Sequence, residues 1–315
     1  MRILIVGGFG YLGGRIASYL AQVGHQIVLG SRKTVVSPSW LKNAGVVKIE
    51  WDNINELERS CSGIDLIIHA AGMNAQDCLN NPIEAVAFNG SATGMLVEAA
   101  CKAKVERFIY LSTAHVYSDP LTGVITEKTL PKNTHPYATS HLLGEQYLLA
   151  ANKSGQIKGA VLRLSNAFGA PTDKKANCWM LLINDLCKQA VETKTLILKT
   201  NSSNERDFIP LKEVCYKIQE FIIPEKYSSI GIFNVGNGSS KTILSVAEII
   251  QLRCIEVLGF KPQIKTRKNK FGIKTSSLKY LSDKIPNYQI NYKGHNWLDE
   301  IDELLEFCSK NFKKI

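Results

Sequence analysis

Residues 2–13 read RILIVGGFGYLG, and this stretch is the strongest indication of the fold in the sequence. Its first five residues have the apolar composition of a buried strand, and a run of glycines follows at once. Glycines here permit a tight turn, a close approach of the backbone to a pyrophosphate, and close contact between helix and strand. A glycine-rich turn alone is the plainer alternative, but the position between a strand and a helix favours a dinucleotide site. The residues predicted to surround its phosphates are Gly7, Gly10, Tyr11, Leu12 and Gly13.

Short apolar runs alternate with helical stretches through the first half of the chain. Their Val, Ile and Leu content predicts strands that are buried on both faces, as in a parallel sheet. The predicted strands are residues 2–6, 26–29, 46–50, 66–69, 108–112 and 159–163. The helices expected between them lie near residues 11–23, 54–61, 81–103 and 138–152. This alternation predicts an α/β fold with a Rossmann-type doubly wound parallel sheet.

The alternation loosens after about residue 170. Further helices are expected near residues 178–191, 243–258 and 297–311. We therefore expect a dinucleotide-binding Rossmann domain over residues 1–170. A smaller C-terminal substrate-binding lobe is expected mostly from residues 171–315, with some segments returning to the Rossmann sheet.

The composition is that of a globular enzyme. Of the 315 residues, 45% are hydrophobic and 21% charged, which excludes collagen-like, coiled-coil and largely disordered chains. Eight scattered cysteines without metal-ligand spacing predict reduced thiols in the cytoplasm and no metal site. No run of about 20 apolar residues is present, so no membrane span is expected. The net charge of +10 suggests anionic ligands, but no nucleic-acid recognition motif accompanies it.

The end of the second predicted strand bears on which dinucleotide would bind. An acidic residue there would accept a hydrogen bond from the ribose 2′-OH of NAD, whereas a basic residue accommodates the 2′-phosphate of NADP. The sequence at this point reads Ser31-Arg32-Lys33, with no acid. Solvated loop cations are the plainer alternative. We favour NADP over NAD as the cofactor.

A second set of motifs extends through the chain. FIYLSTAHVYS ends in a Ser-Thr pair and a short loop, and PYATSHLLGEQ follows about twenty residues later. Together with GGFGYLG, these motifs resemble the extended short-chain dehydrogenase/reductase family, in its nucleotide-sugar epimerase/dehydratase/reductase branch. RLSNAFGAP (163–171), NERDFIPLKEV (204–214) and FNVGNGSSKTILSVAEII (233–250) extend the resemblance over most of the chain.

The resemblance implies a role for each matching residue. Thr113 is expected to hydrogen-bond the substrate oxygen and Tyr137 to exchange its proton, because hydride transfer at a carbinol carbon requires a proton to move at the oxygen. The residues implied to bind the substrate diphosphate are Asn166 and Arg206, with Thr113 at the reacting oxygen. The further residues implied to contact the cofactor are Asp52 and Asn53 near the adenine, Ala70, Ala71 and Gly72 near the nicotinamide, and Asn89.

One catalytic position departs from the family pattern. The family has a Lys four residues after the Tyr, where it lowers the pKa of the phenol and holds the nicotinamide ribose, but this chain has His141. An imidazole with an ordinary pKa of about 6.5 gives a weaker electrostatic pull near neutrality. Two alternatives remain. Either His141 binds the ribose and supports catalysis, or the site is impaired and the protein is a non-catalytic NADP-binding sensor.

The reaction is the least determined feature. The sugar 4,6-dehydratases of the family carry an Asp-Glu pair after the active-site Thr, and this chain has Ala114-His115, which disfavours dehydration. We favour a 4-ketoreductase, because NADP selectivity suits an enzyme that consumes NADPH, with a 4-epimerase using bound NAD as the alternative. Reduction of hydrophobic ketones is disfavoured by Asn166 and Arg206. The resemblance also implies a homodimer through the helices near 81–103 and 138–152.

Overall fold

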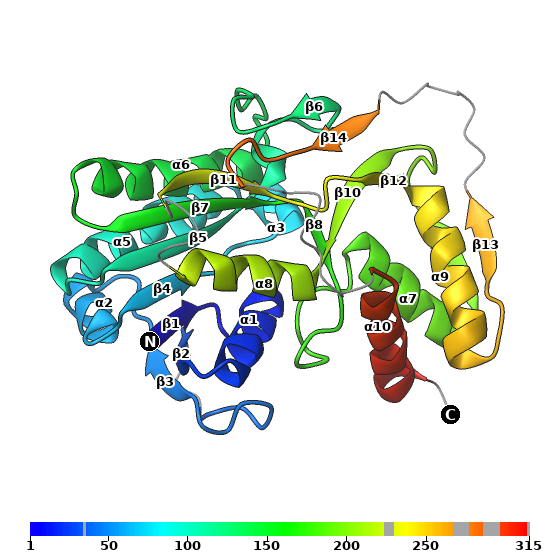
Figure 1. The fold of residues 1–315 in the computed structure, drawn as a ribbon, viewed down its shortest axis with the longest axis horizontal. Coiled ribbons are helices and arrows are strands. Elements are labelled where there is room, and N and C mark those ends of the chain that lie inside the picture. The colour runs from blue at the N-terminus through cyan, green and yellow to red at the C-terminus, as the bar shows by residue number, and fades with distance from the viewer. Residues whose placement is uncertain (34–35, 224–229, 267–276, 286–296, 314–315) are drawn as a thin grey trace.

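We describe the protein from a computed structural model, in residues 1–33, 36–223, 230–266, 277–285 and 297–313. A seven-stranded sheet lies at the centre of the larger part of the molecule, in the order β11-β7-β5-β4-β1-β2-β3 (Figure 1). Each neighbouring pair is parallel. From β1, the strand order continues through β2 to β3 at one edge of the sheet, and through β4, β5 and β7 to β11 at the other edge. This order confirms the predicted doubly wound sheet. The strands are β1 Arg2–Val6, β2 Gln26–Ser31, β3 Gly45–Lys48, β4 Leu66–His69, β5 Arg107–Thr113, β7 Lys158–Leu164 and β11 Gly231–Val235.

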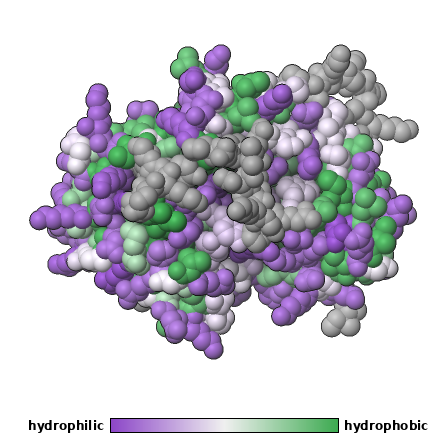
Figure 2. Space-filling model, in the orientation of Figure 1, coloured by the Kyte–Doolittle hydropathy of each residue, from purple (hydrophilic) through white to green (hydrophobic). Residues whose placement is uncertain are grey.

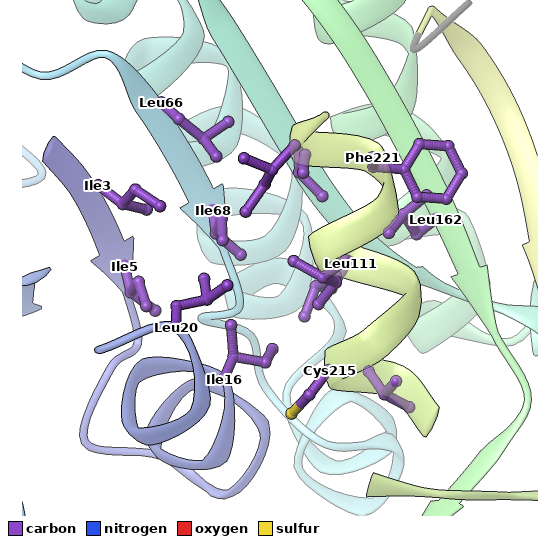
Figure 3. Packing of buried hydrophobic residues seen from close by; sticks show 14 of the residues in the cluster. Ile3, Ile5, Ile16, Leu20, Leu66, Ile68, Leu111, Leu162, Cys215 and Phe221 are labelled. Atoms are coloured by element: carbon purple, nitrogen blue, oxygen red, sulfur yellow. The ribbon is translucent and has the colours of Figure 1, made fainter. Parts of the chain in front are cut away.

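Helices cover both faces of this sheet. One face carries α1 Tyr11–Gln22 and α8 Leu211–Ile222, and the other carries α2 Ile54–Cys61, α5 Ala92–Lys102 and α6 Pro136–Lys153. Successive strand side chains point to opposite faces, so each strand supplies both layers. Figure 3 shows the α1/α8 side, where apolar side chains of the two helices pack on strand residues. Burying each Ile or Leu in this way contributes about 1.5–3 kcal/mol.

The helix expected near 81–103 is interrupted. The described structure has α3 Ala75–Asn80, α4 Pro82–Ala85, a π-helical turn Val86–Ser91, and then α5. In a π-helical turn each backbone hydrogen bond spans five residues instead of the four of an α-helix, and such turns often occur at functional sites. This turn buries the side chain of Asn89 against α6. The apolar periodicity of the sequence does not reveal such an interruption, because the residues on both sides remain helical.

A smaller lobe is built around three helices. α7 Leu182–Thr193, α9 Ile243–Leu258 and α10 Trp297–Phe312 share one apolar core (Figure 1). The sequence predicts a helix near 178–191, but α7 begins only at Leu182. Residues 178–181 form a hydrogen-bonded turn instead. Helix α8 and strand β11 come from the second half of the chain and pack with the Rossmann sheet.

Three small sheets complete the described structure. The three-stranded sheet runs in the order β12-β10-β8, and the pairs are β13-β9 and β14-β6. A largely buried ion pair, Arg15 to Glu300 at 3.1 Å, joins α1 to α10 and so fixes the lobe against the part that contains the seven-stranded sheet. The strands are β6 Gly123–Ile125, β8 Asn166–Phe168, β9 Thr195–Leu198, β10 Glu205–Pro210, β12 Ser240–Thr242, β13 Gln263–Thr266 and β14 Leu278–Tyr280.

The surface is mainly hydrophilic on the face shown in Figure 2, with apolar side chains scattered over it. Within the described ranges, no helix has the length and apolar character needed to cross a membrane. All eight cysteines are described, and none forms a disulfide.

Candidate active site

The glycine loop between β1 and α1 forms the base of the site. Gly7 has φ +86°, and a Cβ there would lie 2.7 Å from the backbone nitrogen of Ala71. A Cβ on Gly13 would lie 2.2 Å from the carbonyl oxygen of Gly7. Helix α1 begins after Gly10 with no capping side chain and no acidic residue in its first turn. Among the described residues no side chain caps its first N–H groups, and such groups at a helix start can bind an anion.

A cavity of about 990 Å³ opens over this loop and extends from β2 to the smaller lobe. Its walls come from the ends of β1, β2, β4 and β5, from the start of α6, and from β8 and β10 of the lobe. Parallel sheets bind ligands at this edge, beyond the carboxyl ends of the strands. The predicted site residues that line it are Gly7, Gly10, Tyr11, Leu12, Ser31, Arg32, Ala70, Ala71, Gly72, Thr113, Tyr137, His141, Asn166 and Arg206.

Four predicted residues do not line the cavity. Gly13 lies beneath the loop, in contact with Gly7. Asp52 is exposed, and the side chain of Asn53 accepts hydrogen bonds from the first N–H groups of α2 as its N-cap. Asn89 is buried, where its Oδ1 accepts a hydrogen bond from the Met73 amide at 2.7 Å. Asn89 thus holds the loop that follows β4.

Thr113 and Tyr137 come together from β5 and the first turn of α6. The Tyr137 side chain forms a hydrogen bond with Thr113, and burial raises the pKa of Tyr137 to about 12 despite this bond. The Thr113 hydroxyl oxygen also accepts a hydrogen bond from the His115 amide at 3.1 Å. Tyr137 is therefore a protonated phenol at neutral pH.

His141 lies one helical turn after Tyr137, and the two rings meet edge to face with centroids 4.6 Å apart. Its Nδ1 lies 2.8 Å from the hydroxyl oxygen of Tyr110. Burial lowers the pKa of His141 to about 4, so the imidazole is neutral at pH 7. The position occupied by Lys in the family thus carries no charge here to lower the pKa of Tyr137.

The β2 end of the cavity is basic and aromatic. The Arg32 guanidinium lies 5.3 Å from the centre of the Phe88 ring, which in turn packs edge to face with Trp51 at 5.4 Å. Ser31 and Lys33 line the cavity beside them. Sequence reasoning did not identify Trp51 or Phe88. Their only signal was that each directly precedes a predicted residue, Asp52 or Asn89.

The lobe end of the cavity contains Asn166, Arg206 and His115. Asn166 Nδ2 donates to the carbonyl oxygen of Asp207 at 2.8 Å, which ties β8 to β10. The Asp207 side chain is fully buried and accepts the Asn237 amide instead of pairing with Arg206. Burial lowers the pKa of Arg206, with Asp119 opposing the shift. A partly desolvated guanidinium thus borders the cavity, and within the described ranges no carboxylate forms an ion pair with it.

The model of the NAD dependent epimerase/dehydratase family matches residues 3–236, which is most of the chain. The chain belongs to this family. A UDP-glucose 4-epimerase of Mycoplasma genitalium is 26% identical over 277 residues, covering 79% of this chain and 80% of that protein. A dTDP-6-deoxy-L-talose 4-dehydrogenase (NAD(P)(+)) of Kitasatospora kifunensis is 25% identical over 256 residues, covering 79% and 78%.

The fold of this epimerase/dehydratase family member is also found in solved structures. The UDP-glucose 4-epimerase of Thermus thermophilus in complex with NAD superposes with a TM-score of 0.77 and 19% identity, covering 98% of this chain and 99% of that one. The resemblance drawn from the sequence motifs and the expectation of an enzyme of this family are confirmed. The roles of the individual site residues stay predictions.

Proposed function

We propose that this chain catalyses the NAD(P)-dependent reduction of a 4-keto nucleoside-diphosphate sugar. The observation that carries the proposal is the pairing of Tyr137, a phenol whose pKa burial raises to about 12, with the neutral His141 beside it. With this pKa Tyr137 is protonated at neutral pH and forms little phenolate, so it can donate a proton but is a poor base. Reduction of a ketone requires a donor at the carbonyl oxygen, whereas oxidation of an alcohol requires a base there.

The residues of the cavity fit a nicotinamide dinucleotide. The glycine loop leaves no room for a Cβ, and the uncapped start of α1 favours a pyrophosphate there, held by Gly7, Gly10, Tyr11 and Leu12. The small residues 70–72 would border the nicotinamide. The bound cofactor supplies the hydride.

The chain itself moves and orients a proton. Tyr137 would donate its hydroxyl proton to the substrate oxygen, and the Thr113 hydroxyl would hold that oxygen in place. The edge of His141 that faces the cavity would bind the ribose next to the nicotinamide. Because this imidazole is neutral, its contribution is a hydrogen bond without a net charge.

The substrate class follows from the lobe end of the cavity. Arg206 offers a planar fork of donors that suits a diphosphate, and its partial desolvation favours an anionic partner. Asn166 and His115 lie beside it. A hydrophobic ketone would offer no anionic partner to this desolvated guanidinium, so such substrates are disfavoured.

NADP is the proposed cofactor. Ser31, Arg32 and Lys33 border the end of the cavity that would hold the adenosine, and the Phe88 ring supports the Arg32 guanidinium. We expect Arg32→Ser to raise the KM for NADPH by tenfold or more while leaving that for NADH within about twofold. An equal loss with both cofactors would contradict the preference for NADP. Exposed Arg59, which lies outside the cavity, provides the matched control Arg59→Ser.

A second candidate is a 4-epimerase with tightly held NAD, which the similarity to the Mycoplasma genitalium UDP-glucose 4-epimerase favours. The two reactions differ in cofactor turnover. A reductase consumes one NADPH per product, whereas an epimerase interconverts two sugars with no net change in cofactor. Incubation of purified protein with nucleoside-diphosphate 4-keto sugars and NADPH, followed at 340 nm and by product chromatography, separates them.

A third possibility is the non-catalytic sensor. Tyr137→Phe tests it, since the substitution removes only the hydroxyl. Loss of turnover with unchanged cofactor binding would support the enzyme. Binding of NADP without turnover of any nucleoside-diphosphate sugar by the unmodified protein would refute the proposed reductase and support a sensor.

We also propose a homodimer through α5 and α6. A groove lies between these helices, lined by residues that include Gly94, Met95 and the exposed Tyr147. A Cβ on Gly94 would lie 2.7 Å from the Tyr147 ring, so the helices pack closely at this point. Sedimentation of the unmodified protein and of Met95→Lys tests the proposal, which a monomeric unmodified protein would refute.

A further inference from the structure

A buried tyrosine lies behind His141, on the side away from the cavity. Tyr110 is in β5, is only 1% exposed, and has its hydroxyl oxygen 2.8 Å from His141 Nδ1. The two rings also stack, with centroids 5.8 Å apart. The proposed reaction does not use Tyr110. Its hydroxyl contacts neither the glycine loop nor the predicted substrate residues.

The hydrogen bonds around Tyr110 determine where its proton goes. The hydroxyl lies 2.8 Å from His141 Nδ1 and 3.5 Å from the carbonyl oxygen of Asn89, and the Thr93 hydroxyl is a third neighbour. The same carbonyl already accepts a hydrogen bond from Thr93 at 2.7 Å. The carbonyl oxygen of Asn89 could accept both hydrogen bonds, but the much shorter contact favours donation from Tyr110 to Nδ1.

A neutral imidazole whose Nδ1 accepts must carry its proton on Nε2. The Nε2 edge of His141 faces Gly72, because a Cβ on Gly72 would lie 3.8 Å from His141 Cε1 and 3.9 Å from Nε2. Gly72 and His141 both line the cavity. Within the described part of the chain, Nε2 has no hydrogen-bond partner.

We propose that Tyr110 is a positioning residue that fixes His141 as the Nε2–H tautomer and so presents this N–H as a donor at the cofactor end of the cavity. This inference rests on the proposed function for its kinetic consequence, but not for its structural one. This N–H would supply the hydrogen bond that the Lys ammonium group supplies in the family, but without a positive charge. We expect the effect of Tyr110 on catalysis to be transmitted mainly through the imidazole.

The neighbouring histidine has its proton on the same nitrogen for a different reason. His69 Nε2 lies 2.9 Å from Thr93 Oγ1, whose own proton is donated to Asn89, so His69 donates. Its Nδ1 is buried and has no hydrogen-bond partner among the residues that the structure describes. His69 and His141 are thus two neutral Nε2–H imidazoles on either side of Tyr110. Tyr110→Phe is expected to change only His141, which gives the test an internal reference.

The structural test is ¹⁵N NMR of histidine-labelled apo protein at pH 7. His141 is assigned by the signal that disappears in His141→Gln. We expect unmodified protein to show the Nε2–H tautomer for His141, and Tyr110→Phe to show a tautomer mixture or averaged shifts, with His69 unchanged. A Nδ1–H tautomer in the unmodified protein, or the same single tautomer in Tyr110→Phe, would overturn the proposal.

The kinetic test uses a double-mutant cycle with His141→Lys. Loss of one neutral hydrogen bond corresponds to about fivefold to tenfold in affinity or rate. We expect Tyr110→Phe to weaken NADP binding and kcat/KM by this factor, but by less than about twofold when position 141 is Lys, since the ammonium needs no tautomer. Tyr280→Phe, which removes another buried hydroxyl bonded to the Arg163 carbonyl, is the matched control.

The outcomes separate the two proposals. If the unmodified protein reduces no nucleoside-diphosphate sugar, the proposed function fails, while the tautomer and NADP affinity still test Tyr110. If Tyr110→Phe costs the same in both backgrounds, or no more than Tyr280→Phe, its role is structural and the proposal of a positioning residue is refuted.

Discussion

The carboxylate of Glu145 in α6 forms a two-pronged ion pair with the guanidinium of Arg163 in β7, at 2.6 Å and 3.0 Å. Both side chains are almost fully buried, and Ser112 of β5 donates to the same carboxylate. The pair therefore ties the helix that carries Tyr137 and His141 to the centre of the sheet. The position of the proposed catalytic residues at the start of α6 is therefore expected to depend on this attachment, about two helical turns after Tyr137.

Replacing Glu145 with Gln is expected to lower the free energy of unfolding by about 3–5 kcal/mol, because Arg163 would keep a buried charge without its partner. Urea denaturation measures the change. Glu106→Gln removes a carboxylate from an exposed pair with Lys158 and should cost less than about 1 kcal/mol. Equal losses in the two variants would show that burial of the Glu145 pair has no energetic consequence.

Gly13→Ala is expected to damage the phosphate site. The added methyl would lie 2.2 Å from the carbonyl oxygen of Gly7, so α1 must move away from the loop. Overpacking of this kind costs about 1–3 kcal/mol, and NADP affinity should fall by at least tenfold. Calorimetric titration measures the affinity. Gly45→Ala is the control, since its methyl would be 3.5 Å or more from any neighbour; a similar loss of affinity there would argue against a local effect.

Arg206→Gln is expected to affect the substrate and not the cofactor. A charged hydrogen bond to a phosphate contributes about 1.5–3 kcal/mol, so the KM for a nucleoside-diphosphate sugar should rise roughly tenfold to a hundredfold. The dissociation constant for NADP should stay unchanged. Lys199→Gln, at an exposed cation of the same lobe, provides the comparison. Equal KM values for Arg206→Gln and the unmodified protein would remove Arg206 from the proposed site.

The pH dependence follows from the phenol. With the pKa of Tyr137 raised to about 12, the proton donor stays protonated up to high pH, and kcat/KM for reduction should be independent of this group from pH 6 to about 9. Deprotonation removes the donor, so the rate falls only as pH approaches the pKa. In His141→Lys the ammonium lowers the pKa of Tyr137, and the fall should begin at least one pH unit lower. Identical profiles for the two proteins would show that position 141 does not affect Tyr137.

Local sequence predicted the parts of the site that depend on consecutive residues. The glycine loop follows from spacing within residues 7–13, whereas Thr113 and Tyr137 were implied by the resemblance of their motifs to the family, at the end of a strand and the start of a helix. These elements keep their geometry wherever the rest of the chain lies. The six strands predicted before residue 170 are also found, because burial on both faces produces a strong compositional signal.

Contacts between distant segments could not be predicted in the same way. Alternation along β5 places Tyr110 on one face of the sheet, but it does not say that His141 of α6 will meet it there. The extra residue of the π-helical turn leaves no mark in the helical periodicity, although it sets the position of Asn89. Strand β11 is only five residues long, and its place beside β7 depends on tertiary packing.

Strand β11 and helix α8 have a practical consequence for any attempt to divide the chain. β11 pairs with β7 along its whole length, and α8 covers apolar side chains of the central sheet. A fragment ending at residue 170 would expose the hydrogen-bonding edge of β7 and the apolar face beneath α8. Such an edge is a template for intermolecular pairing. The two halves of this protein are therefore expected to fold as one cooperative unit, and the isolated first half to aggregate.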